Sequence, residues 1–461
     1  MIIGENRLPL MVSISGIRGI IGESLTPEMI VKYVSAFAEY SKFGTVVIGR
    51  DGRITGNALS EIVASILRLS GGNVIDIGIV PTPTVQIAIE KLKASGGIAI
   101  TASHNPIEWN GLKFLSSSGL FLNAEENLAF WKIANTGSPR YVSWNHIGTY
   151  SQDSSMIDFH IKSILSLPYI NIEKIRKRNY KIILDCVNSA GGNIVPKLLK
   201  EFGCSIVELN CDVSGVFAHT PEPIPENLTQ LCDAVKKYKA DFGIAVDPDV
   251  DRLVLIDEKG EPYSEEYTIA TVVKFILSKE KPNQHVVINL STTRAVDDIA
   301  AKFSANVFRT PVGEINVATK MKELGAIIGG EGSGGVILPK IHIGRDAPIG
   351  IALILQMLAE FNGTLSELKL TLPQYSIVKG KVNVTSIDSD TAFRRIQQLY
   401  SNEGKVNTSD GVKIDFATSW IHLRKSNTEP IVRIIAEAPT KIEAEALVTK
   451  FTNEIKNINN R

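Results

Sequence analysis

The sequence predicts an α/β fold made of three related α/β domains, followed by a smaller C-terminal α+β domain. Short apolar runs that end in Gly or polar residues alternate with longer segments of helical period, a pattern typical of strand–helix units with parallel strands. A pair of strand-like runs recurs three times, at residues 45–51 and 97–101, 181–185 and 243–247, and 285–289 and 325–329. The intervals within the pairs differ, so the recurrence indicates related domains and not a solenoid.

Beyond residue 370 the pattern changes to that of an α+β domain. Alternating apolar and polar residues at 375–384, 420–424 and 431–438 are typical of strands with one buried face, and residues 441–455 have a helical period. We therefore expect four domains, at residues 1–150, 151–256, 257–370 and 371–461. Polar linkers are expected within 135–155, 257–263 and 371–374.

The composition excludes several classes of protein. The 461 residues carry 49 Lys and Arg against 49 Asp and Glu, and 44% of them are hydrophobic. Such a neutral globular chain has no general attraction to nucleic acid, so any anion must be recognised locally. The most apolar run, residues 349–358, is far shorter than the roughly 20 residues that span a bilayer. With four scattered cysteines and no secretory leader pattern, the protein is expected in the cytoplasm, without nucleic-acid or membrane partners.

Three carboxylates follow the second strand of the middle domain, in a segment that we call the aspartate loop (residues 247–252). Asp247, Asp249 and Asp251 alternate along a stretch that we expect to be extended, so that they project to one side. Converging carboxylates repel one another unless a hard divalent cation holds them, and oxygen-only ligands suit Mg²⁺. Arg252 follows directly and offers a positive charge to the acids or to a substrate. A solvated acidic turn is the alternative interpretation.

Ser103 occupies the equivalent place in the first domain, in the serine loop (residues 101–106). A serine hydroxyl needs a base or an attached group to react. His104 is adjacent, but neighbouring side chains on an extended chain point to opposite sides, which disfavours a simple Ser–His pair. A phosphorylated Ser103 would instead offer dianionic oxygen to a metal held by the three aspartates. A polar turn before Pro106 is the structural alternative.

Two further polar loops suit sugar and phosphate ligands. The glycine-rich loop (residues 330–335) contains Glu331 and Ser333; its glycines permit close approach, and Glu331 can accept hydrogen bonds from hydroxyls such as those of a sugar ring. The C-terminal loop (residues 424–430) combines a guanidinium with small hydrogen-bonding side chains, a set that suits phosphate: Arg424, Ser426, Asn427 and Thr428. An ordinary polar turn is the alternative for each loop.

Taken together, these loops resemble those of the α-D-phosphohexomutase family in order and spacing. The resemblance runs from Ser-Gly-Ile-Arg-Gly at 15–19, through Thr-Ala-Ser-His-Asn-Pro at 101–106 and Asp-Pro-Asp-Val-Asp-Arg at 247–252, to the C-terminal loop. It implies three related α/β domains with mixed sheets and a C-terminal α+β domain around a central cleft. It also implies hexose phosphates as substrates, Mg²⁺ and a phosphorylated serine as cofactors, a bisphosphorylated sugar as activator and intermediate, and a monomer or homodimer.

The resemblance also implies a role for each motif. Ser103 matches the phosphoserine, and together with the three aspartates it matches the Mg²⁺ ligands. Arg18 matches an arginine near the reacting group, and Lys113 matches a general acid/base. Arg50 and Arg53 look like supporting residues of the first domain. The glycine-rich loop matches the one that binds sugar hydroxyls, and the C-terminal loop matches the one that binds the phosphate not being transferred.

One departure from the family pattern bears on the substrate. Many bacterial relatives end the glycine-rich loop with His, where this sequence has Gly335. Lys113 or His104 would then have to assist proton transfer. The loop and the Ser-Gly-Ile-Arg-Gly start are similar to archaeal-type members and to some phosphoglucosamine mutases, so the sequence favours the conversion of glucosamine 6-phosphate to glucosamine 1-phosphate over mannose or glucose phosphates.

Two other functions remain open on the sequence. A metal-dependent phosphatase of the haloacid-dehalogenase type could use the Asp-x-Asp run, but that run normally follows the first strand of its domain, and Asp247 lies deep in the chain. A non-catalytic sugar-phosphate-binding protein would keep the loops without needing Ser103.

Overall fold

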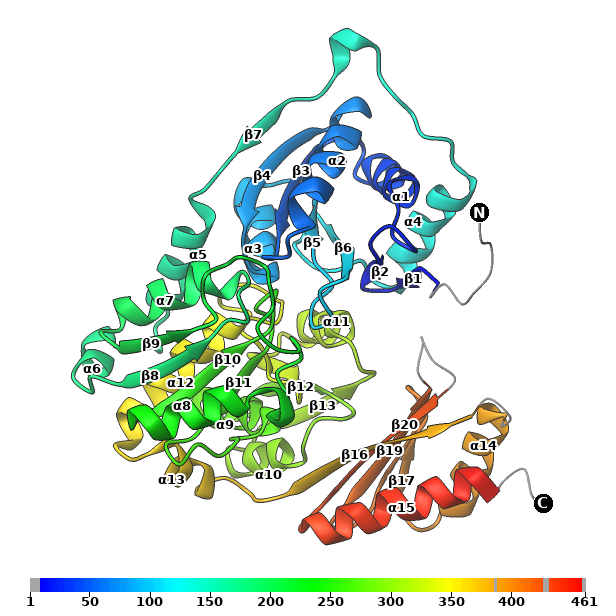
Figure 1. The fold of residues 1–461 in the computed structure, drawn as a ribbon. Coiled ribbons are helices and arrows are strands. Elements are labelled where there is room, and N and C mark those ends of the chain that lie inside the picture. The colour runs from blue at the N-terminus through cyan, green and yellow to red at the C-terminus, as the bar shows by residue number, and fades with distance from the viewer. Residues whose placement is uncertain (1–8, 385–387, 426–430, 458–461) are drawn as a thin grey trace.

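The computed structural model describes residues 9–384, 388–425 and 431–457. Within them the chain forms three mixed α/β sheets and one antiparallel C-terminal sheet, which confirms the predicted fold class. Figure 1 shows the four units in chain order, from the blue N-terminal sheet through two adjoining green sheets to the red C-terminal one, which stands apart from the first. No helix in these ranges has the length and apolarity that crossing a membrane requires.

The first sheet has seven strands in the order β1-β2-β6-β5-β3-β4-β7. These are β1 Met11–Ser13, β2 Gly16–Ile20, β3 Thr45–Arg50, β4 Asn73–Ile79, β5 Gly96–Ile100, β6 Trp109–Ser116 and β7 Tyr150–Gln152, with helices α1 Pro27–Tyr40, α2 Gly56–Leu69, α3 Thr82–Leu92 and α4 Ala124–Thr136. Val46 and Ile48 of β3 face α1, α2 and α4, whereas Val47 faces α3. Helices therefore cover both faces, as parallel strands require.

The predicted polar linker at 135–155 is only partly irregular. Its residues 150–152 form β7, which pairs in parallel with β4 and extends the first sheet. The chain before β7 makes a long excursion, visible at the top of Figure 1.

The second and third sheets share one topology. Their orders are β11-β10-β8-β9 and β15-β14-β12-β13. The second contains β8 Lys181–Asp185, β9 Ser205–Leu209, β10 Phe242–Val246 and β11 Leu253–Ile256, with α5 Met156–Leu165, α6 Ile172–Arg176, α7 Gly191–Glu201 and α8 Thr229–Tyr238. The third contains β12 His285–Asn289, β13 Asn306–Thr310, β14 Ile328–Glu331 and β15 Gly335–Ile337, with α9 Glu265–Lys279, α10 Ala295–Lys302, α11 Glu314–Leu324, α12 Ala347–Phe361 and α13 Leu365–Leu370.

The same pairing scheme underlies all three α/β sheets. In each, one strand (β3, β8 or β12) pairs in parallel with a strand of the predicted second run (β5, β10 or β14), which then pairs antiparallel with the next strand along the chain (β6, β11 or β15). Strand β14, which was predicted to begin at residue 325, begins at Ile328. The reason is that Gly325 ends α11 in a left-handed conformation (φ +61°). The connections after β5, β10 and β14 are therefore structurally equivalent.

The second and third sheets share a single hydrophobic core. Ile182 of β8 and Val286 of β12 belong to one cluster of buried residues, which also includes most of α9 and α12. Residues 347–359 of α12 are all buried. Asp346 caps this helix by accepting a hydrogen bond from the Ile349 amide. The apolar run noted in the sequence is thus a central core helix.

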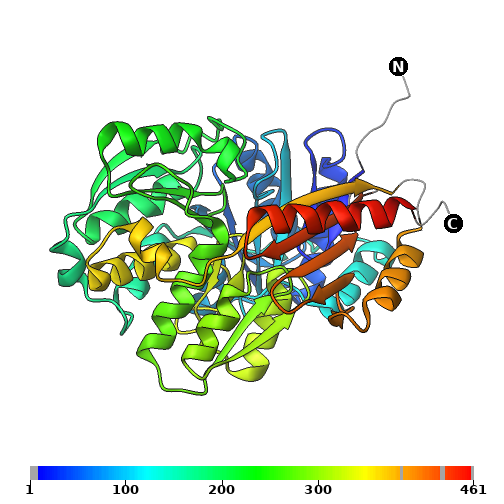
Figure 2. The ribbon, with the colours of Figure 1, turned by 90° about the horizontal axis from the view of Figure 1, so that it is seen from below.

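The C-terminal sheet is antiparallel, in the order β16-β20-β19-β18-β17. Its elements are β16 Ser376–Asn383, β17 Lys405–Asn407, β18 Val412–Asp415, β19 Trp420–Lys425 and β20 Ile431–Ala438, with α14 Ser389–Tyr400 and α15 Lys441–Asn457. Ile421 and Leu423 pack into the core with the two helices, which lie on one face of the sheet (Figure 2). The alternating residues Trp420, His422 and Arg424 therefore belong to the other face.

Candidate active site

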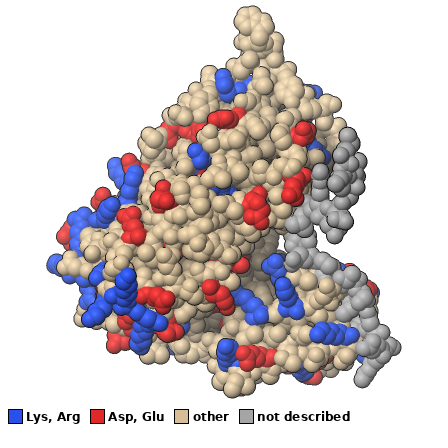
Figure 3. All heavy atoms as spheres, viewed as in Figure 1, with Lys and Arg blue, Asp and Glu red and all other residues tan. Residues whose placement is uncertain are grey.

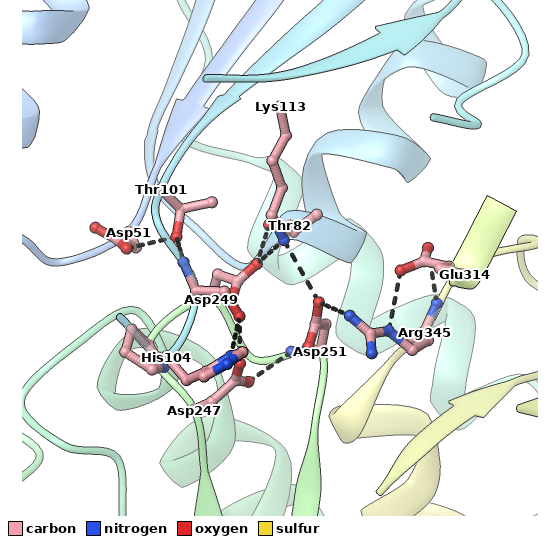
Figure 4. A network of polar contacts seen from close by, with 12 residues as sticks. Asp51, Thr82, Thr101, His104, Lys113, Asp247, Asp249, Asp251, Glu314 and Arg345 are labelled. Atoms are coloured by element: carbon pink, nitrogen blue, oxygen red, sulfur yellow. Dashed lines mark hydrogen bonds and ion pairs between the residues drawn. The ribbon is translucent and has the colours of Figure 1, made fainter. Parts of the chain in front are cut away.

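The three equivalent connections converge on one buried polar centre. Figure 4 shows the residues of the serine loop and the aspartate loop at this centre. The serine loop follows β5, the aspartate loop lies between β10 and β11, and the glycine-rich loop lies between β14 and β15. Ser103, the three aspartates and Glu331 are each at most 4% exposed. A repeated supersecondary unit thus supplies one chemical group from each of three domains.

The aspartate loop gathers its carboxylates by a turn and not, as predicted, by an extended strand. Val250 adopts φ +61°, and its amide bonds back to the Asp247 carbonyl at 3.0 Å. One carboxylate oxygen from each aspartate lies within 4.8 Å of the others. Asp249 Oδ1 and Asp251 Oδ1 are buried without a hydrogen-bond partner. Because buried unpaired oxygens are costly, this donor set fits a hard divalent cation such as Mg²⁺.

Ser103 points into this cluster. Its Oγ lies 3.1 Å from Asp247 Oδ2 and 3.2 Å from His104 Nδ1. The expectation that His104 would point away from Ser103 is wrong, because Ser103 has φ +50° and the chain turns there. Arg252, burial and Arg18 hold the pKa of His104 well below its ordinary value, so this imidazole is neutral near pH 7.

A buried network holds the serine loop in this strained form. Arg53 donates from Nη2 to the Ser103 and Asn105 carbonyls at 2.6 and 2.7 Å, and it pairs with Asp51 at 3.1 Å. Thr101 Oγ donates to Asp51 Oδ2 at 2.6 Å and accepts from the Ser103 amide at 2.9 Å. Arg53 is thus positioned to support the loop, whereas Arg50 bonds only Asn57, on the surface, among the side-chain contacts recorded for it.

Cations from the first domain face the aspartates. Lys113 of β6 lies 2.6 Å from Asp249 Oδ2 and 3.5 Å from Asp251 Oδ2. Burial by itself lowers the pKa of Lys113, but the two carboxylates outweigh burial and raise it above its ordinary value. Arg18 of β2 donates to Asn105 Oδ1 at 3.3 Å; burial lowers its pKa, yet a guanidinium stays charged. Both residues are therefore cationic in this centre.

Arg345 is a central residue that the sequence did not reveal. Its guanidinium lies 2.6 Å from Asp251 Oδ2, 2.8 Å from Glu331 Oε2 and 3.1 Å from Glu314 Oε2. It therefore joins the aspartate loop to the glycine-rich loop. Figure 4 shows Arg345 between Asp251 and Glu314. These carboxylates raise its pKa well above the ordinary value, although burial opposes them. The only sequence signal was its position just before the N-cap Asp346.

The glycine-rich loop is shaped by its neighbours. Glu331 Oε1 accepts from Asn289 Nδ2 and from the Gly313 amide, both at 2.9 Å. A Cβ on Gly335 would lie 2.3 Å from Arg345 Cδ, so the Arg345 stem fills the space beside Gly335. Ser333, half-buried, follows Glu331 by two residues. No side chain larger than hydrogen fits at Gly335 while Arg345 keeps this conformation.

The remaining predicted residues lie around this centre. Arg252 Nε is 3.9 Å from Asp251 Oδ1. Arg424 of the C-terminal sheet pairs with Asp410 at 2.7 Å and is not joined to the aspartates by any contact recorded among the described residues. Ser426, Asn427 and Thr428 lie outside the described residues. Figure 3 shows a hollow between the first and C-terminal domains, with Lys and Arg side chains along its lower edge.

Comparison with known proteins shows which family this sequence matches. The sequence matches four profiles described as phosphoglucomutase/phosphomannomutase: alpha/beta/alpha domains I, II and III at residues 11–140, 158–260 and 264–375, and the C-terminal domain at 381–454. It is 34% identical over 447 residues to the probable phosphoglucosamine mutase of Methanopyrus kandleri, which covers 96% of this chain and 97% of that one. It is 38% identical over 436 residues to the phosphoglucomutase/phosphomannomutase of Thermococcus kodakarensis, covering 93% and 94% of the two chains.

A solved structure agrees with these sequence relatives. A phosphoglucomutase/phosphomannomutase family protein from Burkholderia thailandensis superposes with a TM-score of 0.84 at 26% identity, over 97% of this chain and 98% of that one. Fold, loop order and sequence thus point to the same family. The chain belongs to the α-D-phosphohexomutases, with all four phosphoglucomutase/phosphomannomutase domains, and is a phosphohexose mutase.

Proposed function

We propose that this mutase interconverts hexose 6-phosphates and hexose 1-phosphates through a phosphorylated Ser103 and a bisphosphorylated sugar, with Mg²⁺ bound at the aspartate loop. The observation that carries the proposal is the position of Ser103 Oγ, 3.1 Å from Asp247 and beside two unpaired aspartate oxygens. A phosphoryl group on this oxygen would lie close to the bound metal ion and to the side chains of Lys113 and Arg18, whose positive charges can offset its negative charge. Bound Mg²⁺ would supply that electrostatic stabilisation.

The protein's own side chains account for the proton in the first transfer. A sugar hydroxyl oxygen forms a bond to phosphorus as the bond from phosphorus to Ser103 Oγ breaks. The hydroxyl proton passes to neutral His104, whose Nδ1 is 3.2 Å from Ser103 Oγ, and then to the departing serine oxygen. Lys113 stays protonated and acts through its charge. His104 thereby takes over the proton transfer that Gly335 cannot perform.

The bisphosphorylated sugar must then turn end for end. Its original phosphate reaches Ser103, which regenerates the phosphoenzyme and releases the isomer. Glu331 would bind sugar hydroxyls. The C-terminal loop would bind the phosphate that is not being transferred, through Arg424, Ser426, Asn427 and Thr428. Both sites must accept the sugar in either orientation. A carboxylate suits this role because it can accept hydrogen bonds from different hydroxyls, and a guanidinium suits it because it can bind two oxygens of whichever phosphate is presented.

For the substrate we favour glucosamine 6-phosphate. Relatives at about a third identity over nearly the whole chain are named phosphoglucosamine mutase, among them the Methanopyrus kandleri protein. Another at 38% identity is named phosphoglucomutase/phosphomannomutase, so mannose and glucose phosphates are the second candidates. A coupled assay with each sugar phosphate and a trace of bisphosphosugar decides between them. The expected result is the highest kcat/KM for glucosamine phosphate; a higher value for either other sugar overturns the preference.

Peptide mass analysis of the purified protein tests the chemistry itself. Phosphate on the peptide containing Ser103 is the expected result. An acyl phosphate on Asp247 would indicate a phosphatase instead, and the absence of both would indicate a binding protein.

Asp249→Asn is expected to weaken the dependence on Mg²⁺. The substitution removes one negative charge from the cluster, so the Mg²⁺ concentration for half-maximal rate should rise by at least about tenfold. Direct Mg²⁺ titration by calorimetry gives a readout that does not depend on turnover. Asp212→Asn, at an exposed aspartate, is the control and should leave both values unchanged. Equal Mg²⁺ affinity in the two variants would contradict the assignment.

A further inference from the structure

The third domain contacts the C-terminal sheet through the segments that follow β12 and β13. Ser291 Oγ lies 2.8 Å from His422 Nδ1, and the Arg294 amide donates to Glu437 Oε1 at 2.9 Å. The Val312 amide donates to Asp410 Oδ2 at 2.9 Å. The joint is therefore built at the carboxyl ends of these strands, on the same rim as the glycine-rich loop.

Asp410 is the centre of this joint. Its Oδ2 accepts from the Val312 amide and lies 2.7 Å from Arg424 Nε. Its carbonyl lies 2.7 Å from His422 Nε2. A carbonyl can only accept, so Nε2 carries the proton and Nδ1 accepts from Ser291 Oγ. Burial lowers the pKa of His422 to about 4, which agrees with this neutral tautomer.

The same short segment also holds the sugar-binding carboxylate. Val312 donates its amide to Asp410, and the next residue, Gly313, donates its amide to Glu331 Oε1 at 2.9 Å. Two consecutive amides thus hold one carboxylate from each domain. Asp410 in turn pairs with Arg424, so a continuous chain of contacts runs from Glu331 to the guanidinium.

We propose that Asp410 is a positioning residue that fixes Arg424 relative to Glu331 across the joint between the third and C-terminal domains. The proposal rests on the function proposed above, in which Arg424 binds phosphate and Glu331 binds sugar hydroxyls. A hexose phosphate must contact both at once, so its binding depends on their spacing. Inorganic phosphate would contact only Arg424, so its binding would not depend on the spacing between Arg424 and Glu331.

Asp410→Ala tests the proposal against a matched control. The KM for the preferred hexose phosphate should rise about tenfold, which corresponds to about 1.4 kcal/mol, while kcat changes less than about threefold. Asp410→Asn keeps an acceptor for Val312 but loses the charge, and should give an intermediate KM. The control is Asp390→Ala, which removes the exposed ion pair of the neighbouring Lys425. It should leave KM unchanged.

A double-mutant cycle separates positioning from a general structural role. If Asp410 acts through Arg424, then Asp410→Ala should add nothing to the KM of an Arg424→Ala variant. An additive effect would overturn the proposal, as would equal KM values for Asp410→Ala and Asp390→Ala. Amide hydrogen exchange at Val312 and Gly313 provides a readout without turnover: exchange should accelerate in Asp410→Ala and not in Asp390→Ala, and unchanged exchange would overturn the contact.

The same data distinguish this proposal from the underlying function. A wild-type chain that turns over no hexose phosphate would overturn the proposed function and the positioning role together. An active wild type with unaltered KM in Asp410→Ala would overturn the positioning role alone.

Discussion

Replacing Ser103 by Ala should abolish turnover of every hexose phosphate while leaving the protein folded. The hydroxyl is the proposed carrier of the transferred phosphoryl group, and among the described residues it is the side-chain hydroxyl recorded in contact with Asp247. Loss of a nucleophile costs several orders of magnitude in kcat, so a fall of roughly 10⁴-fold or more is expected. Initial rates in the coupled assay, with a trace of bisphosphosugar, measure it.

Ser41→Ala supplies the control for this change. Ser41 is also a buried serine of the first domain, and its Oγ donates to the Ala38 carbonyl at 3.1 Å, away from the serine loop. Each substitution should alter the free energy of unfolding by about 1 kcal/mol, the usual contribution of one hydrogen bond. Only Ser103→Ala should lose activity. A Ser103→Ala variant that keeps most of its turnover would exclude the phosphoserine mechanism.

Replacing Arg345 by Met should damage both activity and stability. Asp251, Glu314 and Glu331 would lose the guanidinium that lies within 2.6 to 3.1 Å of each of them. Leaving a buried charge unpaired costs about 3–5 kcal/mol, which denaturant unfolding would show. Without the guanidinium, Glu331 and Asp251 should move from their positions. We therefore expect kcat/KM to fall by about 10- to 100-fold, as it does when supporting contacts around a metal are lost.

Two companion variants make this result interpretable. Arg345→Lys keeps a charge in the pocket but cannot reach three carboxylates at once, so it should recover most of the stability and little of the activity. Arg176→Met removes an exposed arginine that also contacts two carboxylates, those of Glu173 and Glu201, and should change stability by less than about 1 kcal/mol. An Arg345→Lys variant with wild-type kcat/KM would show that the three-way contact is dispensable.

The loops of the candidate active site were predictable because each is a contiguous motif. Ser103, the three aspartates and Glu331 directly follow strand-like runs, and parallel strands present such loops at one edge of a sheet. The local conformations were not predictable in the same way. Val250 and Ser103 adopt positive φ, which turns the aspartate loop back on itself and brings His104 to Ser103. Such conformations are uncommon for non-glycine residues and depend on surrounding contacts such as those of Arg53.

The sequence by itself determined the α/β periodicity, the threefold recurrence and the choice of candidate reacting groups, since these depend on residues close together in the chain. The tertiary structure decided which residues from distant parts of the chain contact these groups and hold them in place. Arg345 meets Asp251 across 94 positions, and Asp410 meets Val312 across 98. Neither lies in a recognisable motif. Their partners are fixed only when the sheets pack, because a carboxylate is paired by whichever cation or amide the folded chain brings within hydrogen-bonding distance.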